Sequence, residues 1–269
     1  MPPPRWLLLG LLPTVAYALW RLRRARRVQS RVRPKRLILV RHGESQGNVN
    51  HTIYATVPDH ALHLTDRGWE QAQSAGRELR RIVGEEPTVF YVSPYVRTRE
   101  TMHAIVQAFG GLDRVVYRED PRIREQDFGN FQDPARMAEL KDERWKFGQF
   151  YYRFPDGGES AADVYDRVSS FMESLYRYWD NHPEVENYIM VMHGISIAVF
   201  LMRFLKYDVD EFCTYKNFTN CEFAVLERNA DGWLQLVYVV RNETGTAAVA
   251  KERAKEPEKW QTKRDMRSS

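Results

Sequence analysis

Three short apolar runs, each followed at once by polar residues, constrain the fold of this chain more than any other feature. They are RLILV at 36–40, TVFYV at 88–92 and YIMVM at 188–192. Continuous apolar runs of this length are typical of strands buried on both faces of a parallel sheet. Amphipathic segments alternate with them, which predicts an α/β fold, a three-layer α/β/α sandwich with a mostly parallel central sheet.

The segments between these runs carry helix-start and turn signals. Thr65 is a predicted N-cap, and Ser160 with Asp163 forms a capping pattern. A late hairpin is expected to turn at Ala230, Asp231 and Gly232. The predicted helices cover residues 65–83, 93–109 and 160–179.

Charge is distributed unevenly along the chain. The first 36 residues contain ten Arg or Lys and no Asp or Glu, so the remainder carries 30 basic and 36 acidic residues. The basic pI therefore belongs to the N-terminus, which argues against a nucleic-acid-binding domain and a nucleic-acid partner. The two cysteines, Cys213 and Cys221, form no CxxC motif, which argues against a disulfide framework or a Cys-ligated zinc site.

The N-terminal segment RWLLLGLLPTVAYALWRLRRARR has no charge between Trp6 and Trp20 and an arginine cluster after them. This pattern predicts membrane association through residues 5–24, with the catalytic domain facing the cytosol. The apolar run is shorter than the roughly 20 residues of a typical span. Two alternatives stay open, a mitochondrial targeting element and a cleaved secretory signal with an A-x-A pattern at 16–18.

Composition divides the chain into three parts. Residues 1–34 form the hydrophobic segment and a basic linker, and residues 35–244 form the catalytic domain. Residues 245–269 are charged and are expected to be a disordered tail.

Two of the apolar runs are followed within two residues by a histidine, and the run at 88–92 is followed by Ser93 and Pro94, with Arg97 one helical turn farther on. Arg41 and His42 follow the first run, Arg97 lies beyond the second, and His193 with Gly194 follows the last. In an open α/β sheet, ligands bind outside the carboxyl ends of the strands. Neighbouring strands would bring these imidazoles and guanidiniums into one pocket. Such a set suits a phosphoryl group, because Arg donates bidentate hydrogen bonds to phosphate oxygens.

The position of His42 predicts a nucleophile. Phosphomonoester hydrolysis is very slow without a catalyst, and a nucleophilic His divides it into two easier steps. The attacking nitrogen must be neutral. The reference pKa of His is about 6.5, and neighbouring cations such as Arg41 lower it.

Five motifs, in order along the chain, resemble those of one family. They are LILVRHGESQGN, LTDRGWEQA, SPYVRTRET, REQDFGNF and VMHG. Together they resemble the histidine phosphatase superfamily, the phosphoglycerate mutase-like group. The segments RIREQDFGNF and GESAADVYDRVSSFMESL are most similar to its plant-type phosphoglycerate-mutase-like branch. The resemblance covers roughly residues 35–228.

The resemblance implies a role for each matched residue. His42 is expected to be the phosphorylated nucleophile and Glu125 the proton donor to the leaving oxygen, with His193 as a further catalytic residue. The family needs no metal, so no cofactor is expected. The residues expected to bind the substrate phosphate are Arg41, Asn48, Arg97, His193 and Gly194.

The expected activity is that of a metal-independent histidine acid-type phosphatase, a phosphoric monoester hydrolase with a phosphorylated substrate of unknown class. The alternative is a phosphoglycerate mutase-type phosphotransfer. Family mutases generally carry a longer insertion between the acid and the last His, whereas 67 residues separate Glu125 from His193 here. A third hypothesis is a membrane-tethered, non-catalytic scaffold. The physiological substrate and the oligomeric state stay open.

Overall fold

A single mixed sheet organises the described part of the molecule. The structure is a computed structural model, and it describes residues 33–242 and 249–253. The sheet has seven strands in the order β3-β2-β4-β1-β5-β6-β7. The strands are β1 (Arg36–Arg41), β2 (Thr88–Val92), β3 (Val116–Glu119), β4 (Asn187–Met192), β5 (Phe223–Arg228), β6 (Leu234–Asn242) and β7 (Val249–Arg253).

The three apolar runs form the centre of this sheet. β4 pairs in parallel with β1 on one side and with β2 on the other, and β3 adds in parallel to β2. Strands β5, β6 and β7 continue the sheet beyond β1 in antiparallel pairing. The predicted α/β sandwich is confirmed, with its parallel strands at one side of the sheet and its antiparallel strands at the other.

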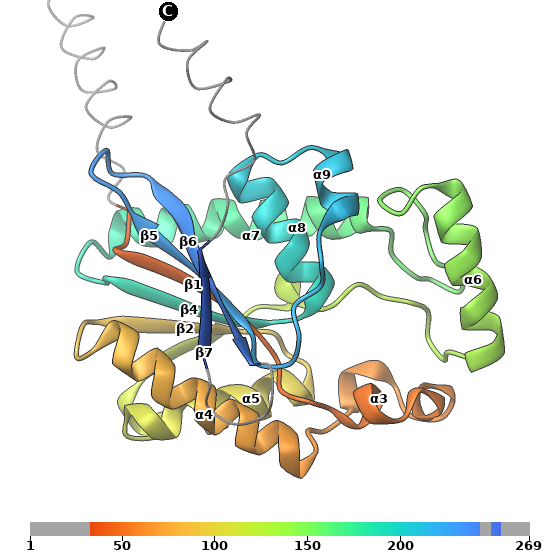
Figure 1. The fold of residues 1–269 in the computed structure, drawn as a ribbon, viewed down its shortest axis with the longest axis horizontal. Coiled ribbons are helices and arrows are strands. Elements are labelled where there is room, and N and C mark those ends of the chain that lie inside the picture. The colour runs from red at the N-terminus through yellow and green to blue at the C-terminus, as the bar shows by residue number, and fades with distance from the viewer. Residues whose placement is uncertain (1–32, 243–248, 254–269) are drawn as a thin grey trace, which may run out of the picture.

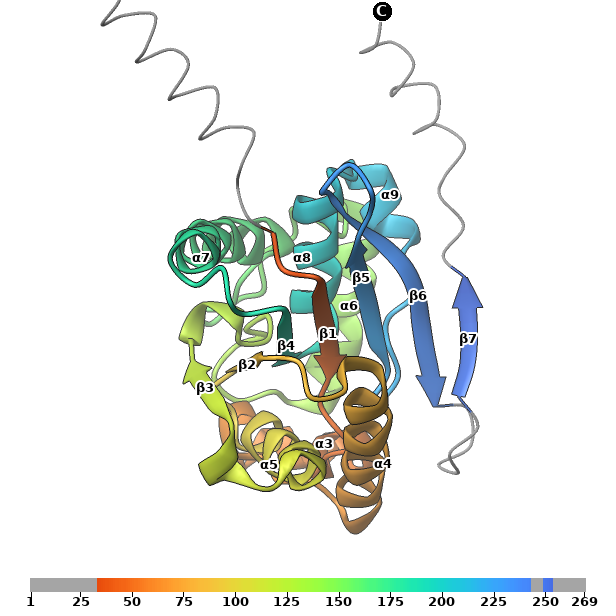
Figure 2. The ribbon, with the colours of Figure 1, turned by 90° about the vertical axis from the view of Figure 1, so that its left-hand side faces the viewer.

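Helices cover both faces of the sheet. Figures 1 and 2 show α4 and α5 on one face and α7 and α8 on the other, while α3 and α6 lie on the side where β1 ends. The α-helices are α3 (Gln46–Val49), α4 (Asp66–Val83), α5 (Val96–Val106), α6 (Pro134–Phe147), α7 (Ala161–Asn181), α8 (Gly194–Leu205) and α9 (Val209–Thr214). The short 3₁₀ helices are η1 (His51–Ala55), η2 (Asp59–Ala61), η3 (Gln107–Phe109), η4 (Leu112–Arg114) and η5 (Pro121–Ile123).

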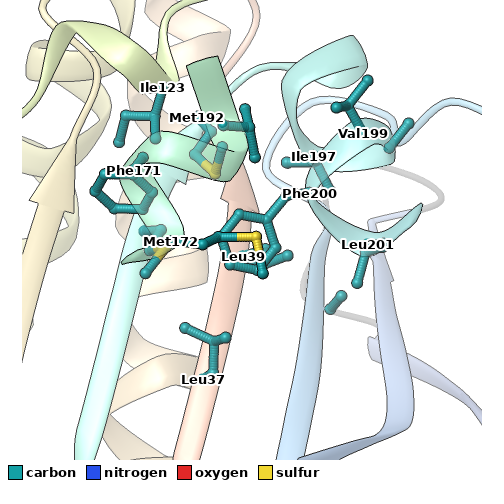
Figure 3. Packing of buried hydrophobic residues seen from close by; sticks show 14 of the residues in the cluster. Leu37, Leu39, Ile123, Phe171, Met172, Met192, Ile197, Val199, Phe200 and Leu201 are labelled. Atoms are coloured by element: carbon teal, nitrogen blue, oxygen red, sulfur yellow. The ribbon is translucent and has the colours of Figure 1, made fainter. Parts of the chain in front are cut away.

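The core has two layers because side chains alternate along each central strand. Leu37 and Leu39 of β1 pack with Phe171 of α7 and Phe200 of α8 (Figure 3). Ile38, with Val40, points to the opposite face and packs against α4 and α5. These four side chains of β1 are fully buried, which explains why the strand is apolar between its two terminal arginines.

The predicted helix caps and the predicted hairpin turn are present, but one helix begins later than predicted. Thr65 accepts a hydrogen bond from the Gly68 N–H at the start of α4, and Ser160 with Asp163 forms a capping box on α7. Helix α5 begins at Val96 rather than near Ser93. The proline at position 94 explains the delay, because a residue before proline is disfavoured in the helical region.

The tail predicted to be disordered contains an ordered segment in the described residues. Val249–Arg253 forms β7, which pairs with β6 and places a further strand at the edge of the sheet. Residues 243–248 and 254–269 lie outside the described residues. The limits of the three predicted parts, 1–34, 35–244 and 245–269, stay a prediction.

The predicted membrane-anchored localisation needs correction. Within residues 33–242 and 249–253, no helix is both long and apolar enough to cross a bilayer. The apolar segment 5–24, on which the anchor and the mitochondrial alternative were based, lies outside the described residues.

Candidate active site

The strand order places the three polar strand ends side by side. β4 lies between β1 and β2, and His42 and His193 directly follow β1 and β4. The centroids of the two imidazole rings are 5.2 Å apart, with an interplanar angle of 60°. Ser93, after β2, lies with its Oγ 2.8 Å from Nε2 of His193. The structure therefore brings the ends of all three strands into one site.

Local contacts define which nitrogen of His42 is available. Nδ1 lies 2.7 Å from the carbonyl oxygen of Gly43, to which only a protonated nitrogen can donate. Nε2 then carries a lone pair, and the Nε–H of Arg97 donates to it at 3.3 Å. His42 is only 3% exposed. A buried imidazole with a defined orientation therefore lies at the carboxyl end of β1.

Both imidazoles are held in the neutral form. Burial lowers the pKa of His42 well below its ordinary value, and the charges of Arg97 and Arg41 lower it further. The pKa of His193 is lowered well below its ordinary value by burial and then by Arg97. A lowered pKa favours the neutral imidazole, in which one ring nitrogen is unprotonated.

Arg97 is a buried cation with a defined orientation. Its Nη1 donates to Oδ1 of Asp59 at 2.8 Å and to the Asp59 carbonyl oxygen at 2.6 Å. Its Nη2 donates to Oδ2 of the same carboxylate at 3.3 Å. Burial lowers and Asp59 raises the pKa of Arg97, with a net rise. The guanidinium thus stays charged next to the His42 imidazole.

Arg41 supplies a second cation. One of its terminal nitrogens donates to the carbonyl oxygen of Phe218. Its Nε is buried without a hydrogen-bond partner among the described residues. A buried donor without a partner is unusual, and such groups occur at functional sites. Arg41 is therefore positioned by one nitrogen and has another available for an anion.

The amide of Asn48 is oriented by its neighbours. Its Oδ1 accepts hydrogen bonds from the N–H and the hydroxyl of Ser45, both at 3.0 Å, and from Nδ2 of Asn220 at 3.0 Å. Asn220 also donates to the carbonyl oxygen of His42 at 3.1 Å. Because its oxygen is fully used, Asn48 is left with its NH₂ group as the part that can bind a ligand.

Glu125 lies in the loop after η5, with its carboxylate against the N-terminus of α8. Its Oε1 accepts from the backbone N–H groups of Gln126 at 3.0 Å and Ser196 at 3.2 Å. Burial raises the pKa of Glu125, although the Gln126 N–H and the charges of Arg97 and Arg41 act in the opposite direction. A raised pKa favours a protonated carboxyl, which a proton donor requires.

The loop that carries Glu125 is held from behind. Arg167 of α7 donates to the carbonyl oxygens of Glu125 at 2.9 Å and of Arg124 at 2.9 Å. The same guanidinium pairs with Glu159, whose carboxylate also accepts the Asp127 N–H at 3.1 Å. These contacts fix the backbone on both sides of the acid.

The glycines after the two histidines make room for neighbouring groups. A Cβ on Gly43 would lie 2.5 Å from the carbonyl oxygen of Gly68, and one on Gly194 would lie 2.2 Å from Oδ1 of Asn217. Both glycines therefore allow a close approach of the protein's own groups, and Gly194 is the first residue of α8.

Several other histidines and charged residues near the motifs are exposed or paired with other groups. His51, His60 and His63 are exposed in the loop after the first motif. Arg99, an exposed residue of α5, pairs with Glu119. Asp120 caps η5 and pairs with Arg122, and Asp127 accepts from the Gly129 N–H.

Sequence reasoning missed two residues of the site. Asp59, in η2, forms the ion pair with Arg97, and Asn220 orients Asn48. Neither lies in a matched motif. Asp59 comes from a short 3₁₀ helix and Asn220 from the turn before β5, whose positions a periodic pattern does not predict.

The described residues hold the parts that phosphoryl transfer needs. Two guanidiniums and an amide can bind phosphoryl oxygens, a neutral imidazole can attack, and a carboxyl with a raised pKa can donate a proton. Within residues 33–242 and 249–253, no group of three or more His, Cys, Asp or Glu side chains could hold a metal ion.

The family comparison agrees with this geometry. The model of the histidine phosphatase superfamily (branch 1) matches residues 37–241. The chain is 48% identical over 219 residues to the phosphoglycerate mutase-like protein AT74H of Arabidopsis thaliana, which covers 76% of this chain and 78% of that protein. It is 31% identical to the broad-range acid phosphatase DET1 of Saccharomyces cerevisiae, over 72% of this chain and 86% of that protein.

A solved structure has the same fold. The mycobacterial glucosyl-3-phosphoglycerate phosphatase superimposes with a TM-score of 0.61, covering 76% of this chain and 97% of that chain at 24% identity. At this identity the likeness concerns the fold alone.

The pH dependence of the histidines provides a test of the site. His42 and His193 are expected to stay neutral well below pH 6.5, whereas the same residues in the unfolded chain take up protons there. The free energy of unfolding should therefore fall as the pH drops through about 6.5. Imidazole ¹⁵N NMR should find Nε2 of His42 unprotonated at pH 6. A protonated Nε2 at that pH would contradict the described environment.

Proposed function

Because the chain belongs to the histidine phosphatase superfamily, in which it is a metal-independent phosphatase, we propose that it hydrolyses phosphomonoesters through a phosphohistidine on His42. The observation that supports this proposal most is the state of His42. Its Nδ1 is used by the Gly43 carbonyl, so Nε2 carries a lone pair next to two guanidiniums.

In the first step, Nε2 of His42 attacks phosphorus and the bond to the ester oxygen breaks. Glu125 gives its proton to that oxygen, so the leaving group departs as a neutral alcohol. Arg41 and Arg97 stabilise the negative charge on the phosphoryl oxygens, together with the NH₂ group of Asn48. His193, buried beside His42, contributes a further contact to these oxygens.

In the second step, water attacks the phosphohistidine. Glu125, now a carboxylate, accepts a proton from this water, and the P–N bond breaks. Inorganic phosphate leaves, His42 returns to its neutral form, and Glu125 is protonated again. The α8 N-terminus, which donates to the carboxylate through Ile195 and Ser196, stabilises Glu125 between the two steps.

The short segment between Glu125 and His193 favours hydrolysis over mutase chemistry. Only 67 residues separate Glu125 from His193, and a family mutase generally needs a longer insertion here. The broad-range acid phosphatase among the relatives supports the same choice. The phosphoglycerate mutase-like names of other relatives keep phosphotransfer as the alternative. A non-catalytic scaffold is disfavoured, since all matched catalytic residues are present.

The phosphoenzyme tests this proposal. Incubation with a phosphodonor should give acid-labile phosphate on the wild-type protein, and His42→Ala should abolish both this label and phosphate release. His103→Ala is a matched control, because His103 is an exposed histidine on α5. Wild-type protein that takes up no label from any donor, or isomerises 3-phosphoglycerate faster than it releases phosphate, would contradict the proposal.

The role of Glu125 is tested by the leaving group. Glu125→Gln should lower kcat by about 10²–10⁴-fold for alkyl phosphates, whose alkoxide is a poor leaving group. The loss should be much smaller for p-nitrophenyl phosphate, which needs little proton donation. Glu119→Gln, which changes a nearby acid paired with Arg99, should leave both rates close to wild type. An equal loss for the two substrates would count against Glu125 as the acid.

A further inference from the structure

The hydroxyl of Ser93 and the imidazole of His193 form a buried hydrogen-bonded pair. The Oγ of Ser93 lies 2.8 Å from Nε2 of His193, and both residues are fully buried. The backbone N–H of Ser93 donates to the carbonyl oxygen of Val191 in β4 at 3.1 Å. The carbonyl oxygen of Ser93 accepts the Thr98 hydroxyl at 2.9 Å. The backbone on both sides of the Ser93 hydroxyl is therefore held in place.

The other ring nitrogen of His193 has a different environment. Nδ1 is buried and has no hydrogen-bond partner within residues 33–242 and 249–253. His193 is the N-cap residue of α8, and an N-cap side chain often accepts a backbone N–H of the first helical turn. The N–H of Ser196 donates instead to Oε1 of Glu125 at 3.2 Å. Nδ1 is thus a buried polar atom left to a ligand, in a ring whose centroid lies 5.2 Å from that of His42.

The position of the ring proton decides how many buried polar groups lack a partner. A neutral imidazole carries one proton, on Nδ1 or on Nε2. In the described part of the chain, Nε2 of His193 is the only hydrogen-bond partner of the Ser93 hydroxyl. A proton on Nε2 would therefore leave the hydroxyl proton and the Nδ1 lone pair both unpaired. A proton on Nδ1 lets the hydroxyl donate to Nε2, so only the Nδ1–H is unpaired. Because unpaired buried polar groups are costly, the second arrangement is favoured.

His42 and His193 then share a tautomer but present opposite groups to the site. In His42, the Nδ1–H donates to the Gly43 carbonyl oxygen at 2.7 Å, and Nε2 presents a lone pair. In His193, the Nε2 lone pair accepts from Ser93, and Nδ1 presents an N–H. An ionised phosphoryl oxygen accepts hydrogen bonds, so it binds an N–H and not a lone pair.

We propose that Ser93 is a positioning residue that fixes His193 in the Nδ1–H tautomer, so that Nδ1 donates to a phosphoryl oxygen. This inference rests on the proposed function, in which His193 contacts the phosphoryl oxygens. It names the atom that makes this contact and the hydroxyl that prepares it.

The tautomer can be measured directly in the full chain. Imidazole ¹H–¹⁵N correlation spectra at neutral pH should show His193 protonated on Nδ1 and unprotonated on Nε2. The signals of His193 are assigned by their loss in His193→Gln. A wild-type protein with His193 protonated on Nε2 would overturn the proposal, whatever the behaviour of any variant.

The variant Ser93→Ala removes the hydroxyl and tests its role. The protonated share of Nδ1 should fall, and the Kd of inorganic phosphate, measured by calorimetry, should rise about tenfold, because a hydrogen bond to a charged group is weakened. A merely structural role would lower only the midpoint of thermal unfolding. Ser93→Ala with the wild-type tautomer and the wild-type phosphate Kd would therefore refute the proposal.

Two further variants serve as controls. Ser93→Thr keeps a hydroxyl at this position and should keep the tautomer and the phosphate Kd of the wild type. Ser169→Ala removes a half-buried hydroxyl of α7, which accepts from Arg203 of α8 at 3.2 Å, and should change neither quantity. Both readouts are independent of turnover. A wild type that has the Nδ1–H tautomer and forms no phosphohistidine would therefore contradict the proposed function and not the role of Ser93 in setting the tautomer.

Discussion

The site depends on a neutral imidazole held against guanidinium groups in a buried place. Burial and the charges of Arg97 and Arg41 act in the same direction on His42, and both disfavour its protonated form. The contact from Nδ1 to the Gly43 carbonyl then leaves the lone pair on Nε2. Exposure of His42 or a neighbouring carboxylate would raise its pKa and so favour the protonated form.

The sheet makes this arrangement possible at little conformational cost. Because β4 pairs with both β1 and β2, the residues after three distant strands meet without a long connecting loop. The apolar strands are buried between two helical layers, so the positions of their last residues are well defined. Reactive groups at such ends are better positioned than groups on an isolated loop. The same edge also receives Asp59 and Asn220, which orient Arg97 and Asn48.

The sequence predicted the parts of the fold that follow a local pattern. Continuous apolar runs identified β1, β2 and β4, and Thr65 and Ser160 marked helix starts. It did not predict Asp59, because an ion pair between a loop and α5 leaves no periodic signal. It also did not predict β7, whose short segment lies in a charged region and is ordered through pairing with β6. The reason for glycine after each histidine likewise required coordinates, since Gly68 and Asn217 are distant in sequence.

The central claim is that His42, His193, Arg41 and Arg97 contact one tetrahedral anion. A crystal structure of the full chain with orthovanadate tests it directly, because vanadate adopts the geometry of a phosphoryl group under attack. The account predicts vanadium bonded to Nε2 of His42, with its oxygens within hydrogen-bond distance of both guanidiniums and of His193. Vanadate bonded to another residue, or bound at His42 without contact to Arg97, would contradict it.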